Sequence, residues 1–137
     1  MIMPKSIKIA LAVMIGFVVW FVAATVANLL IRKSLSGSAE AELASRFTLS
    51  MLLARLAVGA FSSVVAGLAC ALSARPNPVA VKVFAVALVL FFVPVHYSLW
   101  AQFPFWYHAV FLVSLAPLVL VGGWVARHSA WGVRGAA

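Results

Sequence analysis

Residues 9–31 read IALAVMIGFVVWFVAATVANLLI, a run of 23 residues that contains no charged side chain. Lys5 and Lys8 precede this run, and Arg32 and Lys33 follow it. As an α-helix the run would be about 34 Å long, which is enough to cross a hydrocarbon core of about 30 Å. The stretch therefore predicts a transmembrane helix with a basic flank at each end.

A cleaved secretory leader is the alternative interpretation of the same stretch. Thr25-Val26-Ala27 resembles the pattern of small residues at which such leaders are cut. The apolar run is longer than the usual hydrophobic region of a leader, about 7–15 residues, and Trp20 interrupts it. We therefore expect the segment to stay in the chain as the first span.

The composition of the whole chain agrees with a membrane location. Of its 137 residues, 66% are hydrophobic and 9% are charged, whereas soluble domains carry about 25% charged residues. Three further apolar runs follow at residues 51–72, 79–100 and 106–126, and a polar loop at residues 32–47 separates the first two runs. The sequence predicts an all-α integral membrane bundle of four transmembrane helices, forming a single domain over residues 1–137.

The basic residues predict how this bundle is oriented. Ten Lys and Arg stand against two acids, Glu40 and Glu42. Six basic residues lie on the side of the termini and three on the side of the first loop: Lys5, Lys8, Arg75, Lys82, Arg127 and Arg134 against Arg32, Lys33 and Arg46. The positive-inside rule then places both termini in the cytoplasm (N-in/C-in), and we expect a bacterial inner membrane. Because the basic residues flank the spans, the expected partner is the lipid bilayer and not nucleic acid.

Local signals mark the ends of the helices. Ser36 or Ser38 is suited to cap a short helix in the first loop. Asn77 is a candidate cap for the third span, with Pro78 as its first helical residue. Aromatic residues around the third loop predict a belt at the outer interface: Tyr97, Trp100, Trp106 and Tyr107.

Arg55 is the remaining basic residue, and it lies within the second apolar run. Ionisable residues inside spans are candidate functional sites, because burying a charge there costs several kcal/mol. Arg55 is close to the start of its span, so its side chain can also reach the headgroup layer. The alternative is a polar pocket in which Arg55 and Asn28 lie at similar depth near the acids of the first loop. Such a pocket suits a small anionic ligand or a lipid headgroup.

A stripe of small residues continues from Arg55 along the second span. Gly59, Ser63, Gly67 and Ala71 recur every four residues and therefore share one helix face. Small residues at this spacing let two helix backbones approach closely. We expect the stripe to be a helix-packing face inside the bundle, and a self-association face is the alternative.

His96 and His108 lie on either side of the connection between the third and fourth spans. They should therefore have similar depth in the membrane. The simplest interpretation is that both place a polar tip in the headgroup layer. Two facing imidazoles could instead ligate a haem iron, and a quinone site also favours His and Tyr near the interface.

Several kinds of chemistry lack a sequence signal. No Asp or Glu lies in any span, and no hydrolase, phosphate-loop or zinc-protease motif occurs. Cys70 is the single cysteine, so an internal disulfide and a paired-cysteine metal site are excluded. We therefore expect no catalysis, no metal and no cofactor, with haem as the exception to test.

Three functional hypotheses follow from these patterns. The leading one is a non-enzymatic accessory protein that forms a homo-oligomer or joins a membrane-protein partner through the small-residue stripe. The second is a small transporter or permeation unit with Arg55 and Asn28 in a polar path. The third is a haem- or quinone-binding redox subunit that uses His96 and His108.

Overall fold

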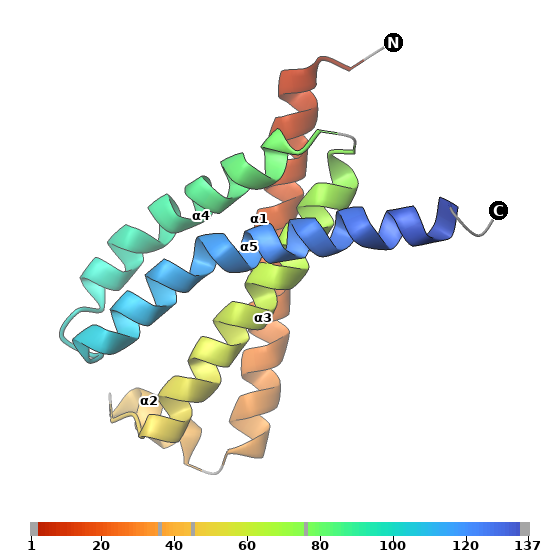
Figure 1. Ribbon diagram of the computed structural model, residues 1–137. Coiled ribbons are helices and arrows are strands. Elements are labelled where there is room, and N and C mark those ends of the chain that lie inside the picture. Colours follow the sequence, from red (N-terminus) through yellow and green to blue (C-terminus); the bar gives the residue numbers. More distant parts are fainter. Residues whose placement is uncertain (1–2, 36, 45, 76, 135–137) are drawn as a thin grey trace.

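The computed structural model describes residues 3–35, 37–44, 46–75 and 77–134. All regular structure in this part of the chain is helical, which confirms the predicted fold class. Figure 1 shows the helices, whose bounds are α1 (Lys5–Ser34), α2 (Ser38–Leu43), α3 (Leu49–Ser73), α4 (Val79–Ser98) and α5 (Phe105–Arg134). The four long helices correspond to the four predicted spans, and α2 is a single short helix in the polar loop.

The long helices have the length and composition of membrane spans. We consider the most apolar 18 residues in each of α1, α3, α4 and the part of α5 from Phe105 to Ser129. Only 22–44% of these residues are buried inside the bundle. Apolar side chains on the outside include Val18, Leu90 and Val113, which are 61%, 66% and 74% exposed. Lipid must cover this surface, since water would not solvate it. The chain is therefore an integral, multi-pass membrane protein.

The apolar runs in the sequence are shorter than the helices that contain them. The first helix begins at Lys5 instead of residue 9, and α5 continues to Arg134 instead of residue 126. Helical hydrogen bonding does not stop where the hydrocarbon ends, so basic flanks extend the helices into the headgroup layer. The third span is the exception, because α4 ends at Ser98, two residues before the predicted end.

α3 is the central helix of the bundle, and it packs most extensively against α5 and then against α1. Figure 1 shows α5 crossing α3 obliquely, with α4 beside the first half of α5. At the crossing, Gly67 of α3 lies against the backbone of Val119, and Gly122 of α5 lies against the carbonyl of Val64. A side chain at either glycine would overlap the facing backbone, so these two residues permit the close approach.

The connections between helices lie at two ends of the molecule. Figure 1 places the N-terminus and the turn between α3 and α4 at one end of α1 and α3, and residues of the first loop at the other. The turn between α4 and α5 lies toward the end that holds the first loop. The polar residues of the first loop and the histidines of the α4–α5 hairpin are therefore on one side of the bundle.

The helix starts differ in part from the sequence prediction. The residue before α2 is Gly37, whose φ of 79° is a left-handed conformation that glycine adopts easily. Ser38 is therefore the first residue of α2 instead of its cap, and Ser36 lies outside the described residues. Asn77 accepts a hydrogen bond from the backbone N–H of Val79 at 3.0 Å. The helix begins at Val79, as the predicted run of residues 79–100 does, and Pro78 is the residue before the helix instead of its first residue.

The aromatic belt is also partly corrected. Tyr97 and Trp100 are 81% and 53% exposed, and Trp106 is partly exposed, as an interfacial belt requires. Tyr107 is only 5% exposed, so its predicted place in the belt was wrong. Its ring packs with Phe103 and Leu52, because that face of α5 is turned toward α3.

Candidate functional site

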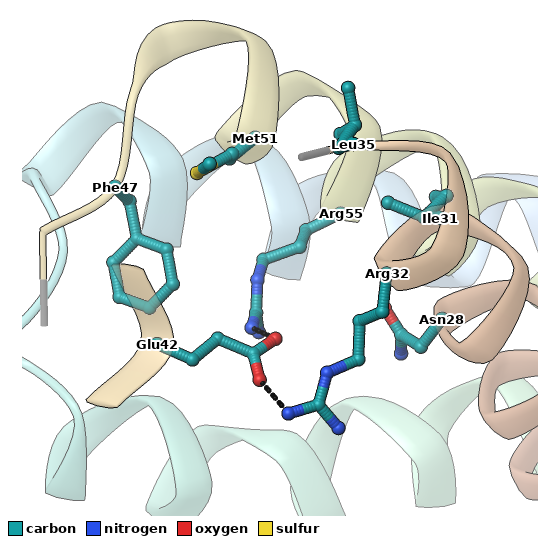
Figure 2. Close-up of a pocket in the computed structure, with 8 residues that line it drawn as sticks. All are labelled: Asn28, Ile31, Arg32, Leu35, Glu42, Phe47, Met51 and Arg55. Carbon is teal, nitrogen blue, oxygen red and sulfur yellow. Dashed lines mark hydrogen bonds and ion pairs between the residues drawn. The ribbon is translucent and has the colours of Figure 1, made fainter. Parts of the chain in front are cut away.

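Two arginines share one carboxylate at the end of the bundle that holds the first loop. A guanidinium nitrogen of Arg55 lies 2.5 Å from Oε1 of Glu42, and one of Arg32 lies 2.7 Å from Oε2. Figure 2 shows the carboxylate of Glu42 between the two guanidinium groups. Two guanidinium groups from different helices thus share one carboxylate.

Three segments of the chain position this cluster. Arg32 is in the last turn of α1, Glu42 is in α2, and Arg55 is in the second turn of α3. A side chain on a helix leans toward the N-terminus of that helix, so Arg55 extends toward the loop and not toward the middle of the bundle. The side chains of Arg55 and Glu42 are 30% and 29% exposed, whereas Arg32 is 47% exposed.

The aromatic ring of Phe47 also contacts the guanidinium group of Arg55. The central carbon of the guanidinium lies 4.9 Å from the centroid of the Phe47 ring, which is a cation–π distance. Phe47 in turn packs on Phe103 at 4.8 Å between ring centroids. The arginine is therefore oriented by an ion pair and by an aromatic ring that is itself fixed.

These residues surround a pocket, which Figure 2 shows in close-up. Asn28 contributes to its wall, so the structure brings together the two residues that the sequence proposed for a polar site. The complete lining is Asn28, Ile31, Arg32, Leu35, Glu42, Phe47, Met51 and Arg55. Cationic and amide groups beside apolar side chains are suited to bind an anion that also carries an apolar part.

His96 and His108 form a second, separate polar cluster. The Nδ1 atoms of the two rings are 2.8 Å apart, so one ring donates a hydrogen bond to the other. Both side chains are buried, at 5% and 1% exposure. The prediction that they place polar tips in the headgroup layer was therefore wrong, because α4 and α5 turn these two positions toward each other.

Aromatic rings surround the histidine pair. Trp100 lies parallel to the His108 ring at 5.0 Å, and Phe111 lies 4.4 Å from the His96 ring. Tyr107 stacks on His96 at 6.0 Å. Within the described residues, Nε2 of His108 is buried without a hydrogen-bond partner. The pair is thus a polar contact enclosed by apolar surface.

In this arrangement the two Nδ1 atoms cannot both bind one haem iron. Metal–nitrogen bonds of about 2.0–2.1 Å would separate two opposed ligand nitrogens by about 4 Å. The two Nδ1 atoms are 2.8 Å apart and bonded to each other, so no iron fits between them. Among the described residues, no three His, Cys, Asp or Glu side chains are grouped to hold a metal ion.

The small-residue stripe of α3 is occupied by helices of the same chain. A Cβ atom on Gly59 would lie 2.7 Å from the Phe111 ring of α5, and Gly67 meets the backbone of α5. Ser63 accepts a hydrogen bond from the indole N–H of Trp20 in α1 at 3.1 Å and donates one to the carbonyl of Gly59. Ala71 is also buried. The stripe is therefore covered by α1 and α5 and presents no free face to a second molecule.

Several residues of these clusters have no distinct signal in the sequence. Arg32 reads as an ordinary basic flank, and Phe47 as one more apolar residue. Glu40 and Glu42 are equivalent by position in the loop, yet Glu40 is exposed and Glu42 binds the arginines. The partner of Trp20 is 43 residues away in the sequence, so only the packing of α1 on α3 shows it.

Comparison with known proteins assigns no function to these clusters. No protein-family model, no curated protein and no solved structure matches this chain.

Proposed function

We propose that this chain is a non-enzymatic membrane protein that binds an oxyanion, such as a phosphate or a carboxylate, between Arg32 and Arg55. The observation that carries the proposal is the sharing of one carboxylate by two guanidinium groups from different helices. Guanidinium groups bind carboxylate and phosphate oxygens through paired hydrogen bonds. The Glu42 carboxylate supports this proposal, because its two oxygens contact one guanidinium group each.

The location of the site favours binding over passage across the membrane. Arg32 and Arg55 lie near the ends of their helices, beside the first loop. A permeation path would need polar groups along the whole length of the bundle, whereas Asn28, Arg32 and Arg55 line one pocket at the end that holds the first loop. Association through the small-residue stripe has lost its main support, because α1 and α5 cover that stripe.

The test is calorimetric titration of the purified protein with inorganic phosphate in micelles of an uncharged detergent. Arg55→Gln and Arg32→Gln should each weaken binding by about tenfold or more, since hydrogen bonds to charged groups contribute about 1.5–3 kcal/mol. Lys33→Gln is the matched control, because it removes an adjacent, exposed positive charge that does not line the pocket. Equal weakening by all three changes, or by none, would contradict the proposal.

The proposed orientation places both termini in the cytoplasm of a bacterium, with the chain in the inner membrane. The excess of basic residues on the side of the termini supports it. Cysteines introduced at Lys8 and at Leu43 would distinguish the two orientations when intact cells are labelled with a membrane-impermeant maleimide. We expect labelling at Leu43, which is 90% exposed, and none at Lys8 until the cells are opened. The natural Cys70 is fully buried and should not react in either case.

A further inference from the structure

We infer that Glu42 is an internal substitute for the ligand, that α2 is a displaceable lid, and that the ligand is the phosphomonoester group of an anionic lipid such as a phosphatidic acid. This inference rests on the proposed function of the two arginines and adds to it a competitor and a ligand class.

α2 is attached to the long helices mainly through one side chain. Of the side chains that the structure describes in this helix, Ala39, Glu40 and Leu43 are exposed, and only Glu42 is partly buried. Leu43, the one large apolar residue of α2, is 90% exposed and makes no core contact. The helix also has few contacts with α1 and α3. Release of the Glu42 carboxylate therefore removes the principal contact made by the described side chains of α2.

Displacement of α2 should require little free energy. Gly37, which precedes α2, has a left-handed backbone conformation that connects α1 to the short helix. A helix of six residues gains little stability by itself. Because none of the described side chains of α2 belongs to the hydrophobic core, its displacement should expose little apolar surface.

A phosphate group is a stronger partner for the two arginines than Glu42 is. A carboxylate carries one negative charge, whereas a phosphomonoester carries about 1.5–2 charges at neutral pH. It also presents three acceptor oxygens, so two can bind Arg32 and Arg55 while the third accepts from Asn28 in the pocket wall. Displacement of Glu42 by phosphate thus replaces one charge by nearly two between the same guanidinium groups.

The surroundings of the site indicate that this phosphate belongs to a lipid. Leu29 precedes Arg32 by three residues, so the two side chains are neighbours on the surface of α1. Leu29 and Leu30 are 52% and 61% exposed, and they belong to a helix long and apolar enough to cross a membrane. A lipid whose headgroup binds the arginines can therefore place an acyl chain along α1. A free phosphate ion would not use this surface.

The experiment compares two probes in the same uncharged micelles: dihexanoyl phosphatidic acid and inorganic phosphate. Wild-type protein should bind the lipid at least about tenfold more tightly than the ion, since each buried methylene contributes about 0.8 kcal/mol. Glu42→Gln should strengthen lipid binding by about threefold to tenfold, because the internal competitor is removed. Glu40→Gln is the matched control, since it removes the same charge from an exposed position of the same helix.

A Leu43→Cys variant that carries a spin label allows the mobility of α2 to be measured directly. A spin label there should become more mobile when dihexanoyl phosphatidic acid is added to the wild type, and it should be mobile without lipid in Glu42→Gln. Unchanged or weaker lipid binding by Glu42→Gln, together with an unchanged label, would overturn the lid. Equal affinities for the two probes would overturn the lipid assignment.

The outcomes separate this inference from the proposed function. If Arg55→Gln abolishes binding while Glu42→Gln does not strengthen it, the arginines bind the anion and Glu42 is part of the site instead of a competitor. If Arg55→Gln binds both probes as the wild type does, the proposed function itself fails.

Discussion

Gly67 of α3 lies so close to Val119 of α5 that a methyl group on the glycine would overlap the carbonyl oxygen of the valine. Gly122 of α5 has the same relationship to the carbonyl of Val64 in α3. The two contacts are reciprocal, and together they bring the backbones of the two helices into direct contact. Most of the bundle is organised around this crossing, because α3 has its most extensive contacts with α5.

Substitution of the crossing glycines should therefore destabilise the protein. Gly67→Ala and Gly122→Ala should each lower the free energy of unfolding by about 3 kcal/mol, at the upper end of the cost of overpacking, because the obstructing atoms belong to the backbone. Gly59→Ala should cost about 1–2 kcal/mol, since the Phe111 ring can move aside. Unfolding by dodecyl sulfate in mixed micelles, followed by circular dichroism, measures these differences. A change in oligomeric state without a loss of stability would instead assign the stripe to self-association.

The hydrogen bond between Trp20 and Ser63 should stabilise the packing of α1 on α3. Trp20→Phe keeps an aromatic ring but removes the indole N–H that Ser63 accepts. We expect a loss of about 0.6–1.5 kcal/mol in the free energy of unfolding, the range for hydrogen bonds between membrane helices. Trp106→Phe is the control, because Trp106 lies at the outer surface of α5. A Trp20→Phe variant as stable as the wild type would show that this bond contributes nothing measurable.

The histidine pair should make the stability of the bundle depend on pH. The bond between the two Nδ1 atoms needs one of them without a proton, so at most one of the two rings can be an imidazolium cation while the bond persists. In the unfolded chain both imidazoles can be protonated. The unfolded state therefore binds more protons at low pH, and the free energy of unfolding should fall as the pH falls from 8 to 5. Tyr107, which stacks on His96, does not change its charge in this range.

A matched pair of variants tests the origin of that pH dependence. His96→Asn retains a hydrogen-bonding group near the position of Nδ1 but does not titrate, so the pH dependence should flatten. His128→Gln should leave it in place, because His128 is exposed and contacts Trp124 instead of another histidine. Unfolding curves at several pH values provide the comparison, and equal slopes in all three proteins would disprove a role of the pair.

Phe47 should contribute to anion binding through its contact with Arg55. Phe47→Leu keeps an apolar side chain and removes the ring that faces the guanidinium. Cation–π contacts at partly exposed sites contribute about 0.5–1 kcal/mol, which corresponds to a twofold to fivefold loss of phosphate affinity. Phe61→Leu removes a ring that is 60% exposed to lipid and should have no effect. A larger loss in Phe61→Leu than in Phe47→Leu would show that the calorimetric signal reports on general stability.

Parts of the candidate site could be predicted from the sequence, and the reasons are local. Arg55 is a charge in an apolar run, and Asn28 is a polar residue near the end of another, so their similar depth follows from helix geometry. The depth of a residue in the membrane does not tell in which direction around the helix axis its side chain points. The choice of Glu42 over Glu40 depends on the path of the first loop, and the contact between His96 and His108 depends on how α4 and α5 are rotated. Tyr107 shows the same limit, since its position near the third loop predicted an exposed ring and its face of α5 made it a buried one.

The sequence by itself determined that the chain is helical, that it lies in a membrane and that it has four spans. These properties follow from the length of uncharged runs and from the cost of placing charges in hydrocarbon, which are sums over many residues and do not depend on contacts. Only the tertiary structure decided that α5 covers the glycines of α3, that two arginines share one acid and that two histidines bond to each other. Each of these contacts joins residues from different helices. It depends on crossing angles and rotations that the packing of all the side chains determines together.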